Sequence, residues 1–324
     1  MSKQAYVGLL VVVSFLICWQ SYSLHKGRMA NGFSLTTMDA VNVSTASTSA
    51  PRNEFSFLLD GKHKCAGRTP FLVLLIPSSP EDSVTRHAIR KTWGNETLLP
   101  GVDILRIFLV GAPHPRTVFT AMQAVLRNES DIFGDVIQQD FLDTYNNLTL
   151  KTMMGMEWVA RFCPNASYVM KIDSDMFFNP VFLVNQLLQP NLPVKKNYFT
   201  GKVIRQARPF RVNTSKWFVS SDEYAKEVYP TYCSGTGYAL SGDLATKVYH
   251  VAPHVQRIHM EDVFMGLCLE KLGIQVTDPP LSVFNGERVD YERCRFTKLI
   301  TVHHYDKDEV LRLWPDFLEA LKTC

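Results

Sequence analysis

The sequence predicts an α/β fold in which a mainly parallel central sheet is flanked by helices. Between residues 71 and 172, short apolar runs alternate with longer amphipathic segments, which is the pattern of strands joined by crossover helices. Such a pattern predicts helices on both faces of the sheet and right-handed crossovers. The composition is that of an ordinary globular protein, with 46% hydrophobic and 20% charged residues among 324.

The alternation assigns each element in turn. FLVLLI is the first strand, and the amphipathic SVTRHAIRKTW that follows it is the first helix. The pattern continues to a fourth strand and loosens beyond Pro180. We expect strands at residues 71–76, 104–110, 135–140, 168–172 and 198–204, and helices at residues 83–93, 116–128, 147–162 and 262–273.

A long apolar segment lies near the N-terminus, where residues 4–24 contain no charged side chain. A helix of roughly 20 residues just crosses a ~30 Å hydrocarbon core. We therefore expect residues 5–24 to form a signal-anchor transmembrane helix behind a short cytoplasmic tail, residues 1–4. A cleaved signal peptide is the alternative, because Ser21 and Ser23 supply a small-x-small cleavage site.

Behind this segment, the composition divides the chain into a stem and one folded domain. Residues 25–64 are rich in Ser, Thr, Asn and Gly and show little periodicity, which is typical of a flexible tether. Residues 65–324 contain the alternating pattern without an internal repeat, so one domain is the simplest division. The net charge of +3 is too mild to predict a nucleic-acid partner, and no basic run is present.

Sequons and cysteines predict that the folded domain is lumenal, behind a type II anchor. The sequons exceed chance expectation, which indicates a glycosylated body. Six cysteines outside the apolar segment permit three disulfides, although Cys268 could instead be a free thiol within a helix. The chain has no Cys-x-x-Cys pair, which argues against a zinc site. The sequons are at Asn42, Asn95, Asn128, Asn147, Asn165 and Asn213.

Two carboxylates, Asp173 and Asp175, directly follow the buried strand predicted at residues 168–172. Carboxylates at that point are costly to desolvate without a partner, and open α/β sheets bind their ligands at the carboxyl ends of the strands. An oxygen-only pair suits Mg²⁺ or Mn²⁺, and such an ion commonly neutralises a diphosphate. The second Asp-x-Asp, Asp306 to Asp308, is better explained as part of a capping box at the start of a helix.

Other candidate residues each have a structural alternative. Arg86 and Arg90 share one helix face and could bind the same phosphates, or could form a solvated face. Glu261 and Asp262 begin a helix, where acidic residues are favoured by the dipole, but one of them could be a general base. His303 follows an apolar run and could complete a Mn²⁺ shell or be structural.

Nine motifs follow one another between about residues 70 and 302, more than two-thirds of the chain. They are RHAIRKTWG, DFLDTYNNLTLKTMMGMEWV, FCP, YVMKIDSDMFFN, YFTG, SKWFVS, YPTYCSGTGYALSGD, HMEDVFMGLCLEKLGI and TVHH. In this order they resemble the β-1,3-galactosyltransferase family of inverting, membrane-anchored Golgi enzymes. The resemblance implies a GT-A type nucleotide-sugar fold, with Mn²⁺ on the diphosphate of UDP-galactose and residues 5–24 in the Golgi membrane.

The resemblance also implies a role for each matching residue. Asp173, Asp175 and His303 match the metal site, although a second imidazole, His304, is a departure from the family pattern. Asp262 matches the catalytic base, with Glu261 as the other candidate. The residues that match positions near the nucleotide sugar are Arg86, Arg90, Asp140, Lys151, Asp173, Ser174, Asp175, Trp217, Tyr232, Gly235, Gly237 and Tyr238.

The expected reaction is transfer of galactose from UDP-galactose, in β-1,3 linkage, to a terminal N-acetylglucosamine or N-acetylgalactosamine of a glycoprotein or glycolipid. One alternative is β-1,3-N-acetylglucosaminyl transfer, because sequence spacing does not reveal the shape of the sugar pocket. Another is a silent glycan-binding relative. Phosphatases of the haloacid dehalogenase type also place Asp-x-Asp after a buried strand, but on the first strand, whereas Asp173 follows the fourth.

Overall fold

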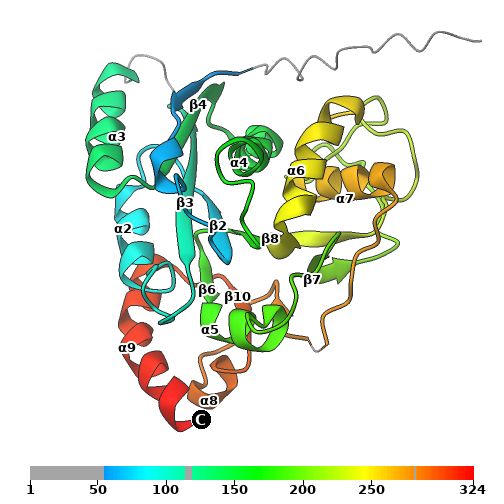
Figure 1. Cartoon of the computed structure of the whole chain (residues 1–324). Coiled ribbons are helices and arrows are strands. Elements are labelled where there is room, and N and C mark those ends of the chain that lie inside the picture. The colour runs from blue at the N-terminus through cyan, green and yellow to red at the C-terminus, as the bar shows by residue number, and fades with distance from the viewer. Residues whose placement is uncertain (1–54, 114–118, 281) are drawn as a thin grey trace, which may run out of the picture. The chain divides into compact units, whose positions relative to one another are not determined.

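The computed structural model describes residues 55–113, 119–280 and 282–324 (Figure 1). The expected tail, the expected transmembrane helix and most of the expected stem lie outside these residues. None of the helices in the described part has the length and apolarity needed to cross a bilayer.

A seven-stranded mixed sheet is the centre of the fold. Four strands in its middle are parallel, as the alternating pattern predicts, whereas β8 runs antiparallel to both of its neighbours and β1 is an antiparallel edge. In spatial order the strands are β1 (Phe57–Leu59), β4 (Val136–Leu142), β3 (Ile104–Ala112), β2 (Leu72–Pro77), β5 (Tyr168–Ile172), β8 (Tyr232–Ser241) and β7 (Phe199–Ile204).

Helices cover both faces of this sheet, because successive side chains of a strand point to opposite faces. On β2, Val73 and Leu75 pack in a core with α4, α6 and α7, whereas Leu74 and Ile76 pack in a second core with α2, α3 and α9. The α2–α9 contact is visible in Figure 1. The helices are α2 (Ser83–Lys91), α3 (Phe119–Phe133), α4 (Leu148–Phe162), α6 (Gly242–Val251), α7 (Glu261–Leu272) and α9 (Lys307–Thr323).

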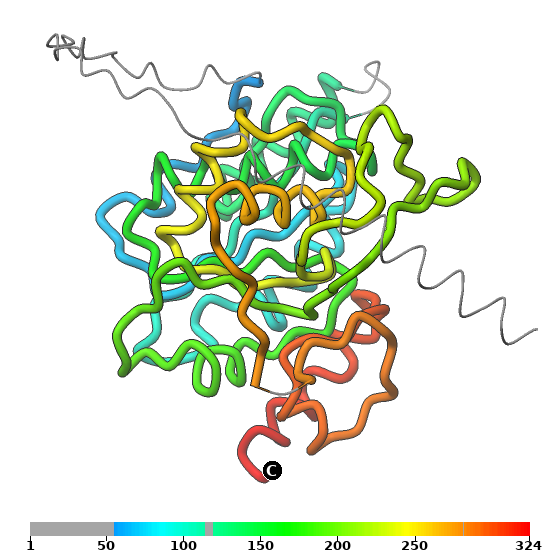
Figure 2. Tube along the Cα trace, turned by 90° about the vertical axis from the view of Figure 1, so that its right-hand side faces the viewer, coloured from blue at the N-terminus to red at the C-terminus, as the bar shows by residue number. Residues whose placement is uncertain are grey.

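A small second sheet lies beside the end of β5. Its middle strand, β10 (Thr301–His303), is antiparallel to β6 (Met176–Phe178) and parallel to β9 (Phe284–Asn285). Phe177 of β6 sits among aromatic rings of the C-terminal segment, including those of Phe296 and Phe317. Figure 2 shows this segment, in orange and red, gathered at one end of the molecule. Short helices α5 (Pro180–Phe182) and α8 (Arg293–Phe296) and a π-helix at Leu183–Leu188 complete the elements around it.

Two expectations are confirmed, one for the C-terminal region and one for Cys268. Asp306 and Glu309 form the capping box of α9. Cys268 is a buried free thiol within α7, and Cys233 is a second one, so the described part has two disulfides where six cysteines permit three. The disulfides join Cys65 to Cys163 and Cys294 to Cys324.

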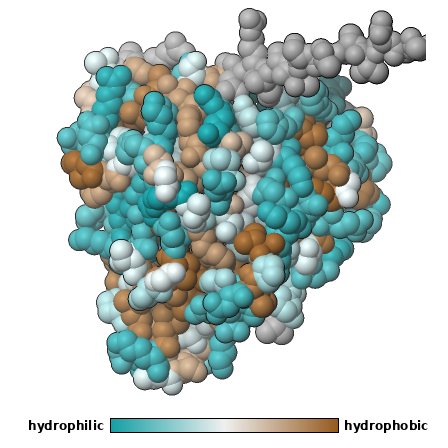
Figure 3. Space-filling model, in the orientation of Figure 1, coloured by the Kyte–Doolittle hydropathy of each residue, from teal (hydrophilic) through white to brown (hydrophobic). Residues whose placement is uncertain are grey.

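The folded unit begins earlier than the composition suggests. Strand β1 pairs with β4, a short 3-10 helix follows at Lys62–Lys64, and the indole of Trp158 donates to the Asp60 carbonyl at 2.8 Å. Residues 57–64 of the expected stem therefore belong to the globular unit, because these backbone pairings outweigh their loop-like composition. Figure 3 shows that hydrophilic side chains cover most of one face of this unit, with apolar patches between them.

Candidate active site

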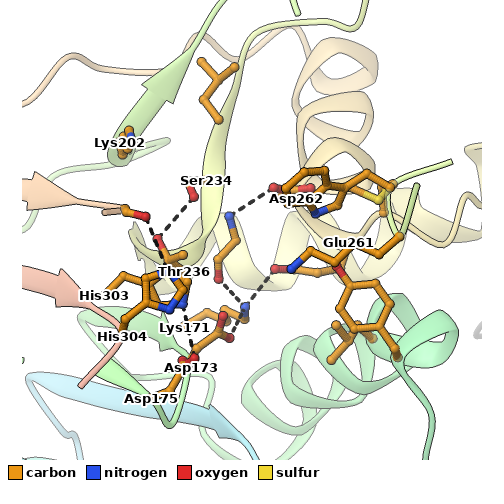
Figure 4. A pocket seen from close by; sticks show the side chains of 18 of the residues that line it. Lys171, Asp173, Asp175, Lys202, Ser234, Thr236, Glu261, Asp262, His303 and His304 are labelled. Atoms are coloured by element: carbon orange, nitrogen blue, oxygen red, sulfur yellow. Dashed lines mark hydrogen bonds and ion pairs between the residues drawn. The ribbon is translucent and has the colours of Figure 1, made fainter. Parts of the chain in front are cut away.

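A cavity of about 540 Å³ opens beyond the carboxyl end of β5. In Figure 4, His303 and His304 lie on one side of it, and Glu261 and Asp262 lie on the opposite side. This is the edge at which open α/β sheets bind ligands. The predicted residues that line the cavity are Asp173, Asp175, Trp217, Gly235, Glu261, Asp262 and His303.

One corner of the cavity holds a carboxylate and two imidazoles. Asp175, His303 and His304 each present a ligand atom, and these atoms lie within 4.8 Å of one another. Oδ2 of Asp175 is 3.2 Å from Nε2 of His303, and the two imidazole rings stack with their centroids 3.8 Å apart. Carboxylate oxygen and imidazole nitrogen are ligands that suit a divalent ion such as Mn²⁺. The residues present at this corner therefore fit the implied metal.

Backbone pairing brings this corner together. In the β10–β6 pair, His303 lies opposite Met176, the residue after Asp175. Two residues on, the backbone N–H of Tyr305 donates to the Asp175 carbonyl at 3.0 Å. His304 between them has φ 63°, a left-handed conformation that is uncommon for a residue other than glycine.

Hydrogen bonds shift the pKa values of the side chains at this corner. The hydrogen bond to Asp175 raises the pKa of His303, against the opposing effect of burial. Burial favours a higher pKa for Asp175, but the hydrogen bond and charge of His303 outweigh it and lower the pKa. Nδ1 of His303 lies 3.2 Å from the Gly286 carbonyl, which accepts a hydrogen bond from its N–H, and Nε2 is directed at Asp175.

Lys171 is a buried ammonium at the floor of the cavity. It ends 2.7 Å from Oδ1 of Asp173 and 2.8 Å from Oε1 of Glu261, and it also donates to the Gly235 carbonyl. Its side chain is only 2% exposed. Burial opposes its charge, but Asp173 and Glu261 outweigh burial and raise the pKa of Lys171. One cation thus orients carboxylates from both sides of the cavity (Figure 4).

The two carboxylates at the start of α7 have different environments. Glu261 is buried, pairs with Lys171, and accepts hydrogen bonds from the hydroxyls of Tyr238 at 3.1 Å and Thr152 at 3.2 Å. Asp262 is only partly buried and accepts from the backbone N–H of Gly235 at 3.1 Å. Burial raises the pKa of both carboxyls. Of the two, Asp262 is the carboxylate that has no buried ion pair and remains available to a ligand.

Gly235 lies where the two carboxylates meet β8. A Cβ atom added here would be 2.8 Å from Oε1 of Glu261 and 3.4 Å from Cβ of Asp262. A side chain would therefore displace the carboxylate of Glu261 and pack in contact with Asp262, which explains why a glycine occupies this point of the strand.

Aromatic and basic side chains form the rim. Trp217 is 41% exposed, hydrogen-bonds to Tyr145, and has the Lys216 ammonium 4.7 Å from its ring centroid. His259 also lines the rim, held by a 2.7 Å contact from its Nδ1 to Glu223. Aromatic surface with a few polar groups is typical of a small-molecule site.

Two predicted phosphate ligands lie in a buried ion-pair network and do not line this cavity. Arg86 is fully buried, and its guanidinium is 2.7 Å from Glu129 and bonds to the loop at residues 78–80. Arg90 is 2.7 Å from both Glu129 and Asp135. Arg86 and Arg90 do share one face of α2, as the spacing predicts. That face is neither solvated nor directed at the cavity, because acidic side chains from α3 and the following turn pair with both guanidinium groups.

Lys151 and Asp140 also lie outside the residues that line the cavity. Lys151 is buried on α4, where its ammonium donates to Asp143 at 2.7 Å and to the Ser78 carbonyl at 2.9 Å. Desolvation lowers its pKa, against the attraction of Asp143. Asp140 is exposed near the edge of the sheet and accepts from the backbone N–H of Ser56 at 2.8 Å.

The remaining predicted residues support the cavity from behind. Tyr238 is fully buried, and its hydroxyl reaches Glu261. Tyr232 is buried in the core that contains α7, Gly237 lies opposite Ile172 in the β5–β8 pair, and Ser174 lies in the turn between β5 and β6.

The motif analysis missed Lys171 as a site residue. Its signal was present, because a lysine inside the otherwise apolar run YVMKI must be paired when the strand is buried on both faces. The rim residues Tyr145, Lys202 and His259 carry no comparable signal, since they come from segments that meet only in the folded chain.

Comparison with known proteins agrees with this arrangement. A family model described as Galactosyltransferase matches residues 84–280. Among curated proteins, β-1,3-galactosyltransferase 2 of Mus musculus is 47% identical over 261 residues, which are 80% of this chain and 61% of that protein. β-1,3-Galactosyltransferase 1 of Mus musculus is 43% identical over 264 residues, which are 82% of this chain and 79% of that protein.

One solved structure is similar to this chain, but too remotely to support an assignment. The WbbM bifunctional glycosyltransferase in its apo form matches with a TM-score of 0.42 and 11% identity, over 78% of this chain and 51% of that one. The family model covers most of the chain, and relatives above 40% identity share most of its length. The chain therefore belongs to the galactosyltransferase family, which confirms the membership that its motifs predict.

Proposed function

We propose that this protein is a Mn²⁺-dependent enzyme that transfers galactose from UDP-galactose, with inversion, in β-1,3 linkage to a terminal N-acetylglucosamine or N-acetylgalactosamine. The observation that best supports this is the cavity itself, in which Asp262 faces a corner made of Asp175, His303 and His304. Such a cavity can accept a metal-bound diphosphate on one side and a sugar hydroxyl on the other.

Asp262 is the proposed general base. The acceptor hydroxyl attacks the anomeric carbon while Asp262 takes its proton, and UDP departs from the opposite face, so an α-linked donor becomes a β-linked product. General-base assistance is worth about 10² to 10⁴ in rate. The raised pKa of Asp262 suits this role, because a more basic carboxylate accepts the proton more readily.

Asp175 and His303 are the proposed metal ligands, with Asp173 in support and His304 beside them. A bound divalent ion stabilises the negative charge that develops on a departing diphosphate. Lys171 holds the carboxylate of Asp173 in place, so the ligand side of the cavity is preorganised.

We also propose the setting that the N-terminal sequence predicts. Residues 1–4 would be cytoplasmic, residues 5–24 would anchor the chain in the Golgi membrane, and the remainder would be lumenal. The two disulfides support an oxidising compartment. The acceptor would be a glycan of a glycoprotein or glycolipid.

The test is an assay of the purified full chain against a panel of UDP-sugars and β-linked hexosamine acceptors, with Mn²⁺ or with a chelator. We expect transfer from UDP-galactose that chelation and Asp175→Ala abolish. Asp308→Ala is the matched control, because it lies in the Asp-x-Asp of the α9 capping box and should keep full activity. Turnover that is unchanged by the chelator would refute the metal role, and transfer from UDP-N-acetylglucosamine alone would refute the choice of donor.

A further inference from the structure

We infer that Arg288 is a positioning residue that holds His303 and His304 in ligand geometry, through a loop at residues 286–289. The inference rests on the metal role proposed above. It concerns Arg288, which lies beyond residue 280, where the match to the family model ends.

The 286–289 loop follows β9 and contacts both histidines. The Gly286 carbonyl lies 3.2 Å from Nδ1 of His303. Two residues later, Nη1 of Arg288 donates to the backbone carbonyl of His304. Two successive residues at the metal corner are thus each held by this short loop.

The next contact along the loop continues this pattern. The hydroxyl of Tyr305 donates to the Val289 carbonyl at 2.7 Å, and the guanidinium carbon of Arg288 lies 4.5 Å from the centroid of the Tyr305 ring. The loop therefore contacts three successive residues: Gly286 bonds to residue 303, Arg288 to residue 304 and Val289 to residue 305.

The contact at His304 matters most, because its backbone is in the left-handed region, with φ 63°. A residue other than glycine keeps such a conformation only when its surroundings hold it there. A hydrogen bond from a charged donor to its carbonyl supplies that restraint. If the restraint is removed, His304 can relax, and its ring loses the stacked position 3.8 Å from His303.

Arg288 is itself fixed by the first turn of α9. Glu309 binds it bidentately, at 2.7 Å and 3.1 Å, and also completes the capping box with Asp306. A lysine cannot make this fork and reach a carbonyl at the same time. The helix start, the loop and the metal corner are therefore connected through one guanidinium.

Stability alone does not explain the arrangement. The side chains of Arg288 and Glu309 are 43% and 27% exposed, and exposed ion pairs contribute little to the free energy of unfolding. The chain offers a matched control in Arg293, which pairs with Asp316 of α9 at 3.4 Å with 44% exposure and touches no cavity residue in that pair.

The experiment measures Mn²⁺ affinity of the full chain by electron paramagnetic resonance of the free ion, for the wild type, Arg288→Ala, Arg288→Lys, Glu309→Gln and Arg293→Ala. Residues that orient metal ligands typically change affinity 10- to 100-fold. We expect about a 10-fold weaker affinity for Arg288→Ala, smaller losses for Arg288→Lys and Glu309→Gln, and none for Arg293→Ala. Thermal midpoints should stay alike, and turnover of Arg288→Ala should recover at saturating Mn²⁺, which a folding defect would not allow.

If Arg288→Ala and Glu309→Gln both bind Mn²⁺ with wild-type affinity, this inference is overturned and the proposed metal role is not affected. Equal weakening in Arg293→Ala would also overturn it, because the effect would then belong to the C-terminal helix in general. A wild-type chain that binds no Mn²⁺ would instead overturn the proposed metal role, and this inference with it.

Discussion

Replacing Lys171 by methionine should show how much the stability of the fold depends on the single buried charge at the floor of the cavity. The substitution keeps the length of the side chain but removes the ammonium that lies 2.7 Å from Asp173 and 2.8 Å from Glu261. Removing one partner of a buried ion pair costs about 3–5 kcal/mol, because the other charge is left without compensation. Glu261 keeps two hydroxyl donors, from Tyr238 and Thr152, so we expect a loss of about 3 kcal/mol.

The loss should depend on pH. Without Lys171, the already raised pKa of Glu261 rises further, so the folded state holds a proton that the unfolded state releases. The free energy of unfolding of Lys171→Met should therefore fall, relative to the wild type, as pH increases through the range between the unfolded and folded pKa values. At mildly acidic pH, protonated Glu261 should relieve part of the penalty.

Equilibrium urea unfolding of the single and double variants checks this. Adding Glu261→Gln to Lys171→Met removes the uncompensated charge and should recover about half of the loss or more. Lys247→Met is the control, because Lys247 pairs with Asp243 on an exposed helix face and should change stability by only about 0.5 kcal/mol. A Lys171→Met protein as stable as the wild type, or a double variant no better than the single one, would refute the reasoning.

Three further predictions follow from the site. Asp262→Asn should lower kcat by about 10² to 10⁴ without weakening UDP binding in calorimetry. In the wild type, the acid limb of the pH–rate profile should lie above the ordinary carboxyl range, because the pKa of Asp262 is raised and the carboxylate loses its base form as pH falls. Gly235→Ala should lower kcat, since the added methyl meets Glu261 at 2.8 Å; full activity would contradict the close approach. Asp135→Asn should destabilise the fold by about 3–5 kcal/mol in urea unfolding, yet leave UDP affinity intact under native conditions, because it breaks the buried pairs with Arg90 and Arg106, and none of these residues lines the cavity.

Much of the sheet could be predicted because its middle strands are buried on both faces. Such strands are continuous apolar runs, and the run predicted at 168–172 matches β5. Strand β8 could not be predicted in this way, because Gly235 and Gly237 interrupt its pattern. Those glycines serve close approaches to other segments, so their reason lies in tertiary contacts and not in strand propensity.

The site was predictable where its residues mark the end of an element. Asp175 follows a buried strand and Asp262 begins a helix, and both line the cavity. The role of Arg86 was not predictable from helix spacing, because its partner Glu129 lies 43 residues away on another helix. Helix spacing shows which side chains share a face, but not what packs against that face.

The pairing of Asp175 with His303 at the corner of the cavity has a consequence for how the protein matures. Asp175 and His303 are separated by 128 positions, and His303 belongs to the last strand of the fold. A nascent chain can pair its central strands well before this histidine leaves the ribosome. A ligand that binds both side chains can stabilise only a finished chain, so the proposed metal ion would favour molecules that have completed synthesis over partly made ones.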